Sequence, residues 1–164
     1  MMPPQPTTEQ FQNDLFEEVQ SLDRDKRIWI EDESLAIGKI FLPNDLWMQM
    51  SVSPMVEISV QKKIRIERLV DEYGLADKGE FLQAMSRISK KLGGQHFIAA
   101  KEKLLQGDMG STVEMLLAYY DKAYLNGLNE KKHRIKLYSP WNGDNVNEYA
   151  RQLVEQVKAL PILV

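Results

Sequence analysis

The chain of 164 residues contains no cysteine. This absence excludes disulfides, thiolate metal sites and thiol nucleophiles, although it assigns no compartment. A Walker A loop is also missing, because around the Gly38-Lys39 pair Glu33 stands where the first glycine belongs and Ile40 where the hydroxyl belongs. No apolar run approaches the roughly 20 residues that cross a bilayer, and the first six residues lack an apolar signal core. We therefore expect a cytoplasmic protein without a membrane anchor.

The charge balance is nearly even, with 24 acidic residues against 21 lysines and arginines. Such a balance indicates neither nucleic acid nor membrane as a partner, so the local distribution of charge has to decide. The two histidines, His96 and His133, lack metal-ligand spacing, and we predict no metal site from them. The length suits a single domain over residues 1–164 with a core of its own.

Three consecutive acids follow a short apolar run. Ile28, Trp29 and Ile30 are β-branched or aromatic, which predicts a buried strand at about residues 28–31. Glu31, Asp32 and Glu33 would then lie at its carboxyl end, where open α/β sheets bind ligands. Acids in that place can hold a metal-bound water or orient a phosphate-bearing substrate. A solvated acidic turn is the alternative.

Apolar periodicity predicts about seven helices. A helix over residues 7–22 has Thr7 and Gln10 in a capping-box arrangement, and a second helix starts at Pro43 with Asn44 as its cap. Others cover about residues 61–73, 77–92 with Asp77 as the cap, 95–106 and 111–126, and the last begins at residue 144 or 145. Glycines mark several of their ends, and Gly127 closes the helix over residues 111–126. Further strands are expected at about residues 37–41, 55–60 and 134–139.

The helix over residues 61–73 begins with the densest basic patch in the chain. Its cations are Lys62, Lys63, Arg65 and Arg68. Cations at a helix start oppose the macrodipole, so they do not serve helix stability there. The alternative is that they are solvated and pair with Glu67 and Asp71 along the helix.

Tyr120, Asp121 and Tyr124 share one face of the helix over residues 111–126, because positions three and four apart are neighbours. They either form a pocket or belong to the helix surface and core.

Several short signatures in this order resemble bacterial tRNA 2-selenouridine synthases. They are Glu31-Asp32-Glu33-Ser34, Ile37-Gly38 and Pro43; Val56-Glu57-Ile58; Arg65, Glu67-Arg68-Leu69-Val70 and Glu72-Tyr73-Gly74; Leu92-Gly93-Gly94; Gly107-Asp108; and Leu116-Leu117 with Tyr119-Tyr120-Asp121 and Tyr124. The likeness covers nearly the whole chain, and it is greatest to the carboxyl-terminal part of the family's P-loop domain.

The resemblance implies a tRNA-modifying transferase that exchanges sulfur for selenium at a wobble uridine, with selenophosphate as co-substrate and no cofactor in this chain. In the family a rhodanese-like domain with a cysteine precedes the P-loop domain, so the chain resembles a piece that is inactive alone and lacks its amino-terminal half. By resemblance, Glu31, Asp32 and Glu33 are the catalytic candidates. The substrate-binding candidates, for phosphate, tRNA or an isoprenoid chain, are Ser34, Gly38, Arg65, Arg68, Tyr120, Asp121 and Tyr124.

The expected fold is helix-rich α/β: a partial P-loop NTPase-like parallel sheet with a lid-like helical insertion over residues 78–126. Missing sheet partners would leave an open edge, which predicts a homodimer. Two alternatives remain. One is a non-catalytic helical module that binds protein or RNA through Lys62, Lys63, Arg87, Lys90 and Lys91, and the other is a divergent ATP- or GTP-binding protein.

Overall fold

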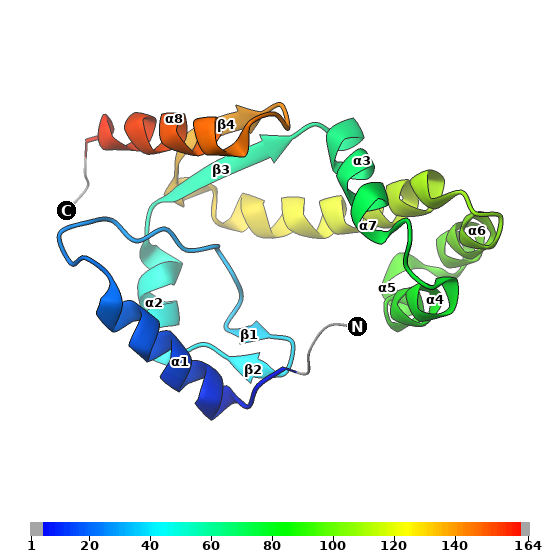
Figure 1. Cartoon of the computed structure of the whole chain (residues 1–164), viewed down its shortest axis with the longest axis horizontal. Coiled ribbons are helices and arrows are strands. Elements are labelled where there is room, and N and C mark those ends of the chain that lie inside the picture. The colour runs from blue at the N-terminus through cyan, green and yellow to red at the C-terminus, as the bar shows by residue number, and fades with distance from the viewer. Residues whose placement is uncertain (1–4, 162–164) are drawn as a thin grey trace. The chain divides into compact units, whose positions relative to one another are not determined.

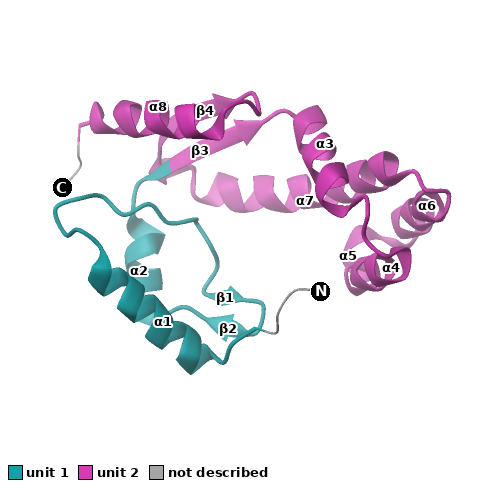
Figure 2. Cartoon of the chain, in the orientation of Figure 1, with its two compact units in different colours: residues 1–55 teal, residues 56–164 magenta. Residues whose placement is uncertain are grey.

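The computed structural model describes residues 5–161, which divide into two compact units (Figures 1 and 2). Residues 1–55 form the first unit and residues 56–164 the second. Two earlier expectations, a single domain over residues 1–164 and a lid-like role of residues 78–126, stay predictions.

The first unit joins two helices to a small hairpin. Its elements are α1 (Thr8–Ser21), β1 (Ala36–Ile37), β2 (Ile40–Phe41) and α2 (Asn44–Val52). The Thr7 hydroxyl accepts a hydrogen bond from the Gln10 backbone N–H at 3.1 Å, which confirms the predicted cap of α1. Ile40, Leu42 and Met50 form the buried apolar centre of this unit.

The strand predicted at residues 28–31 is wrong. These residues have no regular secondary structure, and Ile28, Trp29 and Ile30 are 51%, 48% and 52% exposed. A β-branched run becomes a strand only where a neighbouring strand accepts its backbone hydrogen bonds, and residues 5–161 supply none here.

The strand predicted at residues 37–41 is a hairpin instead. β1 and β2 pair antiparallel, with Ala36 opposite Phe41 and Ile37 opposite Ile40. Gly38 has φ +65°, which lets the chain reverse between the two strands.

The second unit places a run of helices between two strands. Its elements are β3 (Met55–Val60), α3 (Lys62–Tyr73), α4 (Lys78–Arg87), α5 (Ser89–Leu92), α6 (Gly94–Leu105), α7 (Met109–Glu130), the 3-10 turn η1 (Lys132–Arg134), β4 (Ile135–Trp141) and α8 (Val146–Lys158). β3 and β4 form a small parallel sheet, because the chain enters both strands at the same end after crossing back along α7 (Figure 1). The predicted helix-rich α/β class and its parallel pairing are therefore confirmed for these two strands.

The buried apolar side chains of this unit lie on its helices, with Leu153 on α8 and the others on α4 to α7. Its buried side chains on α4 to α7 are Met85, Leu92, Ala100, Leu104, Val113 and Leu117. β3 contributes no buried side chain, and Ile58 on that strand is 49% exposed. The predicted cap of α4 is confirmed, since the Asp77 carboxylate accepts from the Glu80 N–H at 2.9 Å.

Three predicted helix boundaries are wrong. α7 runs through Gly127 to Glu130, because that glycine keeps a helical backbone rather than a positive φ. The helix predicted over residues 77–92 is broken at Ile88 into α4 and α5. Asn44 is the first helical residue of α2, and the cap position is held by Pro43 without a side-chain hydrogen bond.

Candidate functional site: the basic helix at the carboxyl end of the parallel strands

The basic helix α3 begins at the carboxyl edge of the small parallel sheet. β3 ends at Val60 and α3 starts at Lys62, while β4 ends beside it at Trp141. The turn after β4 lies directly on α3, because a Cβ added to Gly143 would meet Ile64 Cγ2 at 2.6 Å. Ligands of open α/β sheets bind at this edge, so its side chains are the first to consider.

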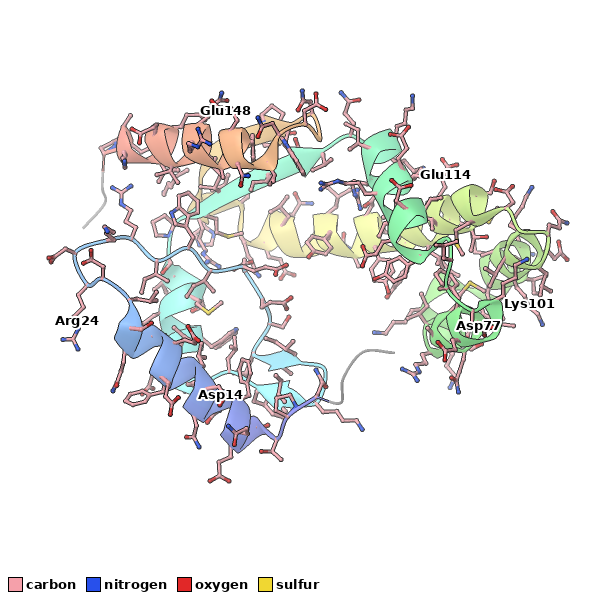
Figure 3. All side chains as sticks on the ribbon, viewed as in Figure 1. Asp14, Arg24, Asp77, Lys101, Glu114 and Glu148 are labelled. Atoms are coloured by element: carbon pink, nitrogen blue, oxygen red, sulfur yellow. The ribbon has the colours of Figure 1, made fainter. Side chains whose placement is uncertain are left out.

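Three of the four α3 cations are paired with carboxylates. Lys62 Nζ lies 2.7 Å from Glu114 Oε1 on α7, a residue labelled in Figure 3. Lys63 Nζ lies 3.8 Å from Glu67 Oε1 one turn along its own helix, as the alternative interpretation predicted. Pairs as exposed as these contribute little to stability.

Arg65 and Asp121, both predicted as site residues, are in direct contact. Arg65 Nη2 donates to Asp121 Oδ1 at 2.7 Å, and each side chain is 34% exposed. The pair joins α3 to α7 across 56 positions of sequence. Asp121 therefore faces a cation, and Arg65 would have to exchange this partner to bind a phosphate.

Arg68 makes a different contact. Its guanidinium Cζ lies 4.5 Å from the centroid of the Trp141 ring, at the end of β4. Trp141 stacks in turn on Tyr149 of α8, with ring centroids 5.7 Å apart and an interplanar angle of 29°. Neither Trp141 nor Tyr149 was predicted from the sequence as a site residue. The Pro140-Trp141-Asn142-Gly143 turn was the available signal, since it puts a tryptophan at a strand end.

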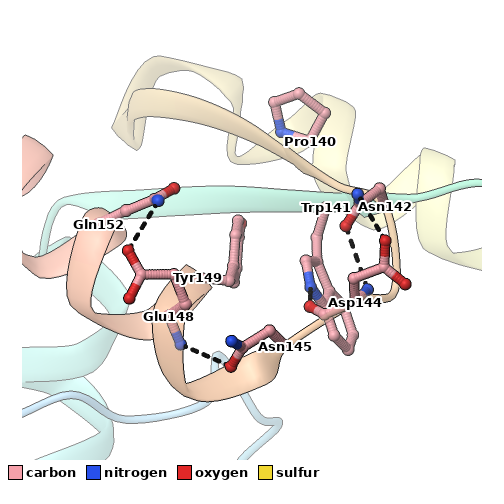
Figure 4. A pocket seen from close by; sticks show the side chains of 8 residues that line it. All are labelled: Pro140, Trp141, Asn142, Asp144, Asn145, Glu148, Tyr149 and Gln152. Atoms are coloured by element: carbon pink, nitrogen blue, oxygen red, sulfur yellow. Dashed lines mark hydrogen bonds between the residues drawn. The ribbon is translucent and has the colours of Figure 1, made fainter.

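An open pocket of about 430 Å³ lies beside this stack (Figure 4). It is lined by Pro140, Trp141, Asn142, Asp144, Asn145, Glu148, Tyr149 and Gln152. Its polar side chains bond to one another: Asn142 Nδ2 donates to Asp144 Oδ2 at 3.1 Å, and Gln152 Nε2 donates to Glu148 Oε1 at 3.0 Å. This internal bonding shapes the turn from β4 to α8.

Tyr120 and Tyr124 lie on the surface of α7 rather than in an enclosed pocket. Tyr120 is 45% exposed and packs edge-on against Tyr119 at 5.2 Å, and Tyr124 is 72% exposed. Exposed rings at this spacing offer a stacking surface more readily than a buried cavity.

The acidic candidates do not lie at a strand end. Glu31, Asp32, Glu33 and Ser34 follow residues 28–30 in an irregular segment of the first unit. The premise that they stand at the mouth of a buried strand is therefore wrong, and their catalytic role stays a prediction. No cluster of three or more His, Cys, Asp or Glu side chains suited to a metal ion occurs within residues 5–161.

Gly38 has a structural explanation in the hairpin of the first unit. The Gln5 side chain bridges the turn, donating to the Ile37 carbonyl at 3.2 Å and accepting from the Lys39 N–H at 3.1 Å. A Cβ at Gly38 would lie 2.7 Å from that carboxamide. The absence of a side chain at Gly38 thus leaves room for Gln5.

In the part of the chain that the structure describes, no helix is long and apolar enough to cross a membrane. No solved structure matches the chain.

Comparison with known proteins identifies the family. A model described as the tRNA 2-selenouridine synthase AAA domain matches residues 1–157. A tRNA 2-selenouridine synthase from Sulfurovum sp. (strain NBC37-1) is 28% identical over 162 residues, covering 80% of this chain and 44% of that protein. Those from Shewanella oneidensis and Shewanella sediminis are 26% and 28% identical, covering 80% of this chain and 43% and 44% of those proteins. The chain thus spans less than half the length of these relatives, and because the family model covers nearly all of it, the chain belongs to the tRNA 2-selenouridine synthase AAA domain family.

Proposed function

We propose that this chain provides a tRNA phosphate-binding surface to a 2-selenouridine synthase, and that α3 carries it. Relatives over this region are named tRNA 2-selenouridine synthase, and RNA is a polyanion that cationic side chains bind. The chain has no cysteine and spans less than half of those relatives. We therefore assign it a share in substrate binding and not the complete exchange of sulfur for selenium from selenophosphate.

The observation that carries the proposal is the position of α3. The helix starts at the carboxyl edge of a parallel β3–β4 pair, with Arg65 and Arg68 on its first turns. A strand, a helix and a parallel return strand form the unit on which P-loop folds are built, so we extend the proposal to a P-loop-like sheet. In this scheme Tyr120 and Tyr124 offer stacking surfaces to bases or an isoprenoid chain.

The residues of the first unit have subordinate roles in this proposal. Glu31, Asp32 and Glu33 would act on the reacting substrate from their irregular segment, with Ser34 as a hydroxyl donor next to them. Gly38 would keep the hairpin turn close to Gln5 rather than contact substrate itself.

The Arg65–Asp121 pair offers the sharpest test, because two substitutions that both break it have opposite effects on anion binding. Arg65→Gln removes a cation and is expected to weaken tRNA binding and to reduce the slope of log K against log salt by about 0.7 to 0.9. Asp121→Asn releases Arg65 from its carboxylate and removes a negative charge, so tRNA affinity should rise. Filter binding with unmodified tRNA at several salt concentrations measures both.

The matched control is Lys158→Gln on α8, an exposed lysine that pairs with Glu155 at 2.6 Å. It removes the same charge as Arg65→Gln from another helix and should leave the slope unchanged. If Arg65→Gln and Lys158→Gln lose equal tRNA affinity, the effect comes from net charge and not from the position of Arg65. If Asp121→Asn binds tRNA more weakly than the parent chain, the Arg65–Asp121 pair acts only as a structural link.

A second candidate, an interaction module for protein or RNA, is favoured by the cations at the ends of α4 and α5. Arg87, Lys90 and Lys91 are exposed, and none of them has an ion pair within the described range. Cations in a last helical turn also complement the helix dipole, which explains them without a partner. If the triple glutamine variant loses more tRNA affinity than Arg65→Gln and Arg68→Gln combined, this surface replaces α3 as the binding face.

A further inference from the structure

Arg68 differs from every other cation on α3. Lys62, Lys63 and Arg65 each have a carboxylate oxygen within 3.8 Å. Arg68 has no ion pair with any of residues 5–161, and its guanidinium lies over the Trp141 ring instead. Among the acids of residues 5–161, none pairs with the charge of Arg68, whereas each of the other three cations on this helix has such a partner.

Arg68 lies over Trp141 although acidic side chains are available on its own helix. Asp71 and Glu72 stand three and four positions after Arg68, the spacing at which helical side chains pair. The guanidinium nevertheless turns to the indole at the end of β4. A guanidinium packed over an aromatic ring uses up no carboxylate, so its N–H donors stay open to a phosphate.

Trp141 is itself held by a second ring and by a hydrogen bond. Tyr149 stacks on it, and the indole Nε1 donates to the Asp144 carbonyl at 2.7 Å (Figure 4). Ser139 fixes the Tyr149 hydroxyl, which lies 2.8 Å from the Ser139 Oγ and 3.1 Å from the Ser139 carbonyl oxygen. Ser139 is only 4% exposed, so the stack is anchored in the buried part of β4.

We propose that Arg68, Trp141 and Tyr149 form a phosphodiester-binding subsite, in which Arg68 contacts a backbone phosphate of RNA and Trp141 is its positioning residue. The proposal rests on the tRNA-binding function proposed for α3 and names the contact within it. A single exposed guanidinium holds a small anion weakly, whereas on a polyanion it adds one contact to many. The ligand is therefore a nucleic acid backbone rather than free phosphate.

Salt-dependent tRNA binding by the whole chain tests the subsite. Arg68→Gln should reduce the slope of log K against log salt by about one contact, roughly 0.7 to 0.9. Trp141→Leu should produce the same reduction, because an unsupported guanidinium turns to Asp71 or Glu72. The double variant should lose no more than either single one, and Trp141→Tyr, which keeps an aromatic face, should retain the slope.

Two further measurements do not depend on the folding of Trp141→Leu. Arg68→Lys keeps the charge but loses the planar stacked donors, so tRNA affinity at fixed salt should fall several-fold. In a Trp29→Phe, Trp47→Phe background Trp141 is the remaining tryptophan, and its fluorescence should change on adding tRNA but not on adding inorganic phosphate at the same phosphate concentration.

The outcomes distinguish a failure of the proposed subsite from a failure of the proposed tRNA binding by α3. If Arg68→Gln lowers the slope while Trp141→Leu and Arg68→Lys leave binding unchanged, the positioning role is refuted and tRNA binding by α3 stands. If a phosphate-induced change in Trp141 fluorescence equals that caused by tRNA, the assignment to a nucleic acid backbone is refuted. If the Arg65, Asp121 and Arg68 variants all bind tRNA as the parent chain does, both proposals fail together.

Discussion

The Asp108 carboxylate caps the amino-terminal end of α7. Its Oδ1 accepts from the Ser111 backbone N–H at 3.0 Å, and its Oδ2 accepts from the Ser111 hydroxyl at 2.7 Å. These hydrogen bonds, with a smaller contribution from Lys103 at 3.4 Å, hold the pKa of the Asp108 carboxyl below its usual value of 3.8. The ionised carboxylate is thus the form that α7 prefers.

A group whose pKa is lower in the folded chain stabilises the fold above its unfolded pKa and loses that effect as the pH falls through its folded pKa. We therefore expect Asp108→Asn, which keeps an oxygen cap but cannot titrate, to be less stable than the parent chain near pH 6. The difference should shrink as the pH falls below 3.8. Urea unfolding followed by circular dichroism at pH 6 and pH 3 measures it, and a difference as large at pH 3 as at pH 6 would contradict the titration of Asp108.

At the scale of elements, two glycines lead to opposite predictions: Gly127, which the sequence predicted to close a helix, and Gly143, which lies in the turn after β4. A Cβ added to Gly127, inside α7, would have no neighbour within 4 Å. Gly143, in contrast, has φ +91°, and a Cβ added there would lie 2.6 Å from Ile64 Cγ2. Gly127→Ala should stabilise the chain by about 0.5 to 1 kcal/mol, because alanine loses less backbone entropy in a helix.

Gly143→Ala should destabilise the chain, because alanine is strained at that φ and its methyl group collides with α3. Thermal unfolding of the two variants beside the parent chain compares them directly, and each serves as the other's control for a Gly→Ala change. A loss of stability in Gly127→Ala would mean that α7 ends at Gly127, as the sequence predicted.

The β3–β4 pair also shows what an element needs from its surroundings. Parallel sheets are normally covered on both faces and have more than two strands. Here the sheet has two strands, and Ile58 and Tyr138 on them are 49% and 58% exposed. What the structure adds to the pair is α8 packed against β4, and the turn after β4 in contact with α3 at Ile64.

At the scale of the whole molecule, large apolar side chains in both units are open to water. Phe16 and Val52 in the first unit are 62% and 78% exposed, and Ile58, Leu75 and Leu105 in the second are 49%, 101% and 58% exposed. Apolar surface of this kind favours association with another chain.

We expect the exposed apolar side chains and the open strand edges to make the isolated chain self-associate. This expectation tests the homodimer predicted from the sequence. Light scattering over a range of concentrations should show a rising mass. Ile58→Lys places a charge on β3 at an exposed position and should reduce the association. A strict monomer at high concentration would contradict the prediction. The control is Lys26→Gln, a change of one charge in the first unit, distant in sequence from Ile58.

Local sequence patterns predicted most of the elements. Thr7 and Asp77 were predicted as caps, and both carry the expected hydrogen bonds, because a cap involves residues only three positions apart. The alternation over residues 55–60 correctly predicted β3. The continuous apolar run at residues 28–30, in contrast, predicted a strand that does not form, because a strand also depends on a partner that local sequence does not reveal.

The sequence by itself determined most of the helices, which side chains on α3 are basic, and the family to which the chain belongs. Only the tertiary structure decided what those cations meet: Asp121 lies 56 positions from Arg65, and Trp141 is brought to Arg68 by the return of the chain into β4. The physical reason is range. Periodicity and capping act within a few residues, whereas ion pairs and ring stacking depend on which distant elements the fold places side by side.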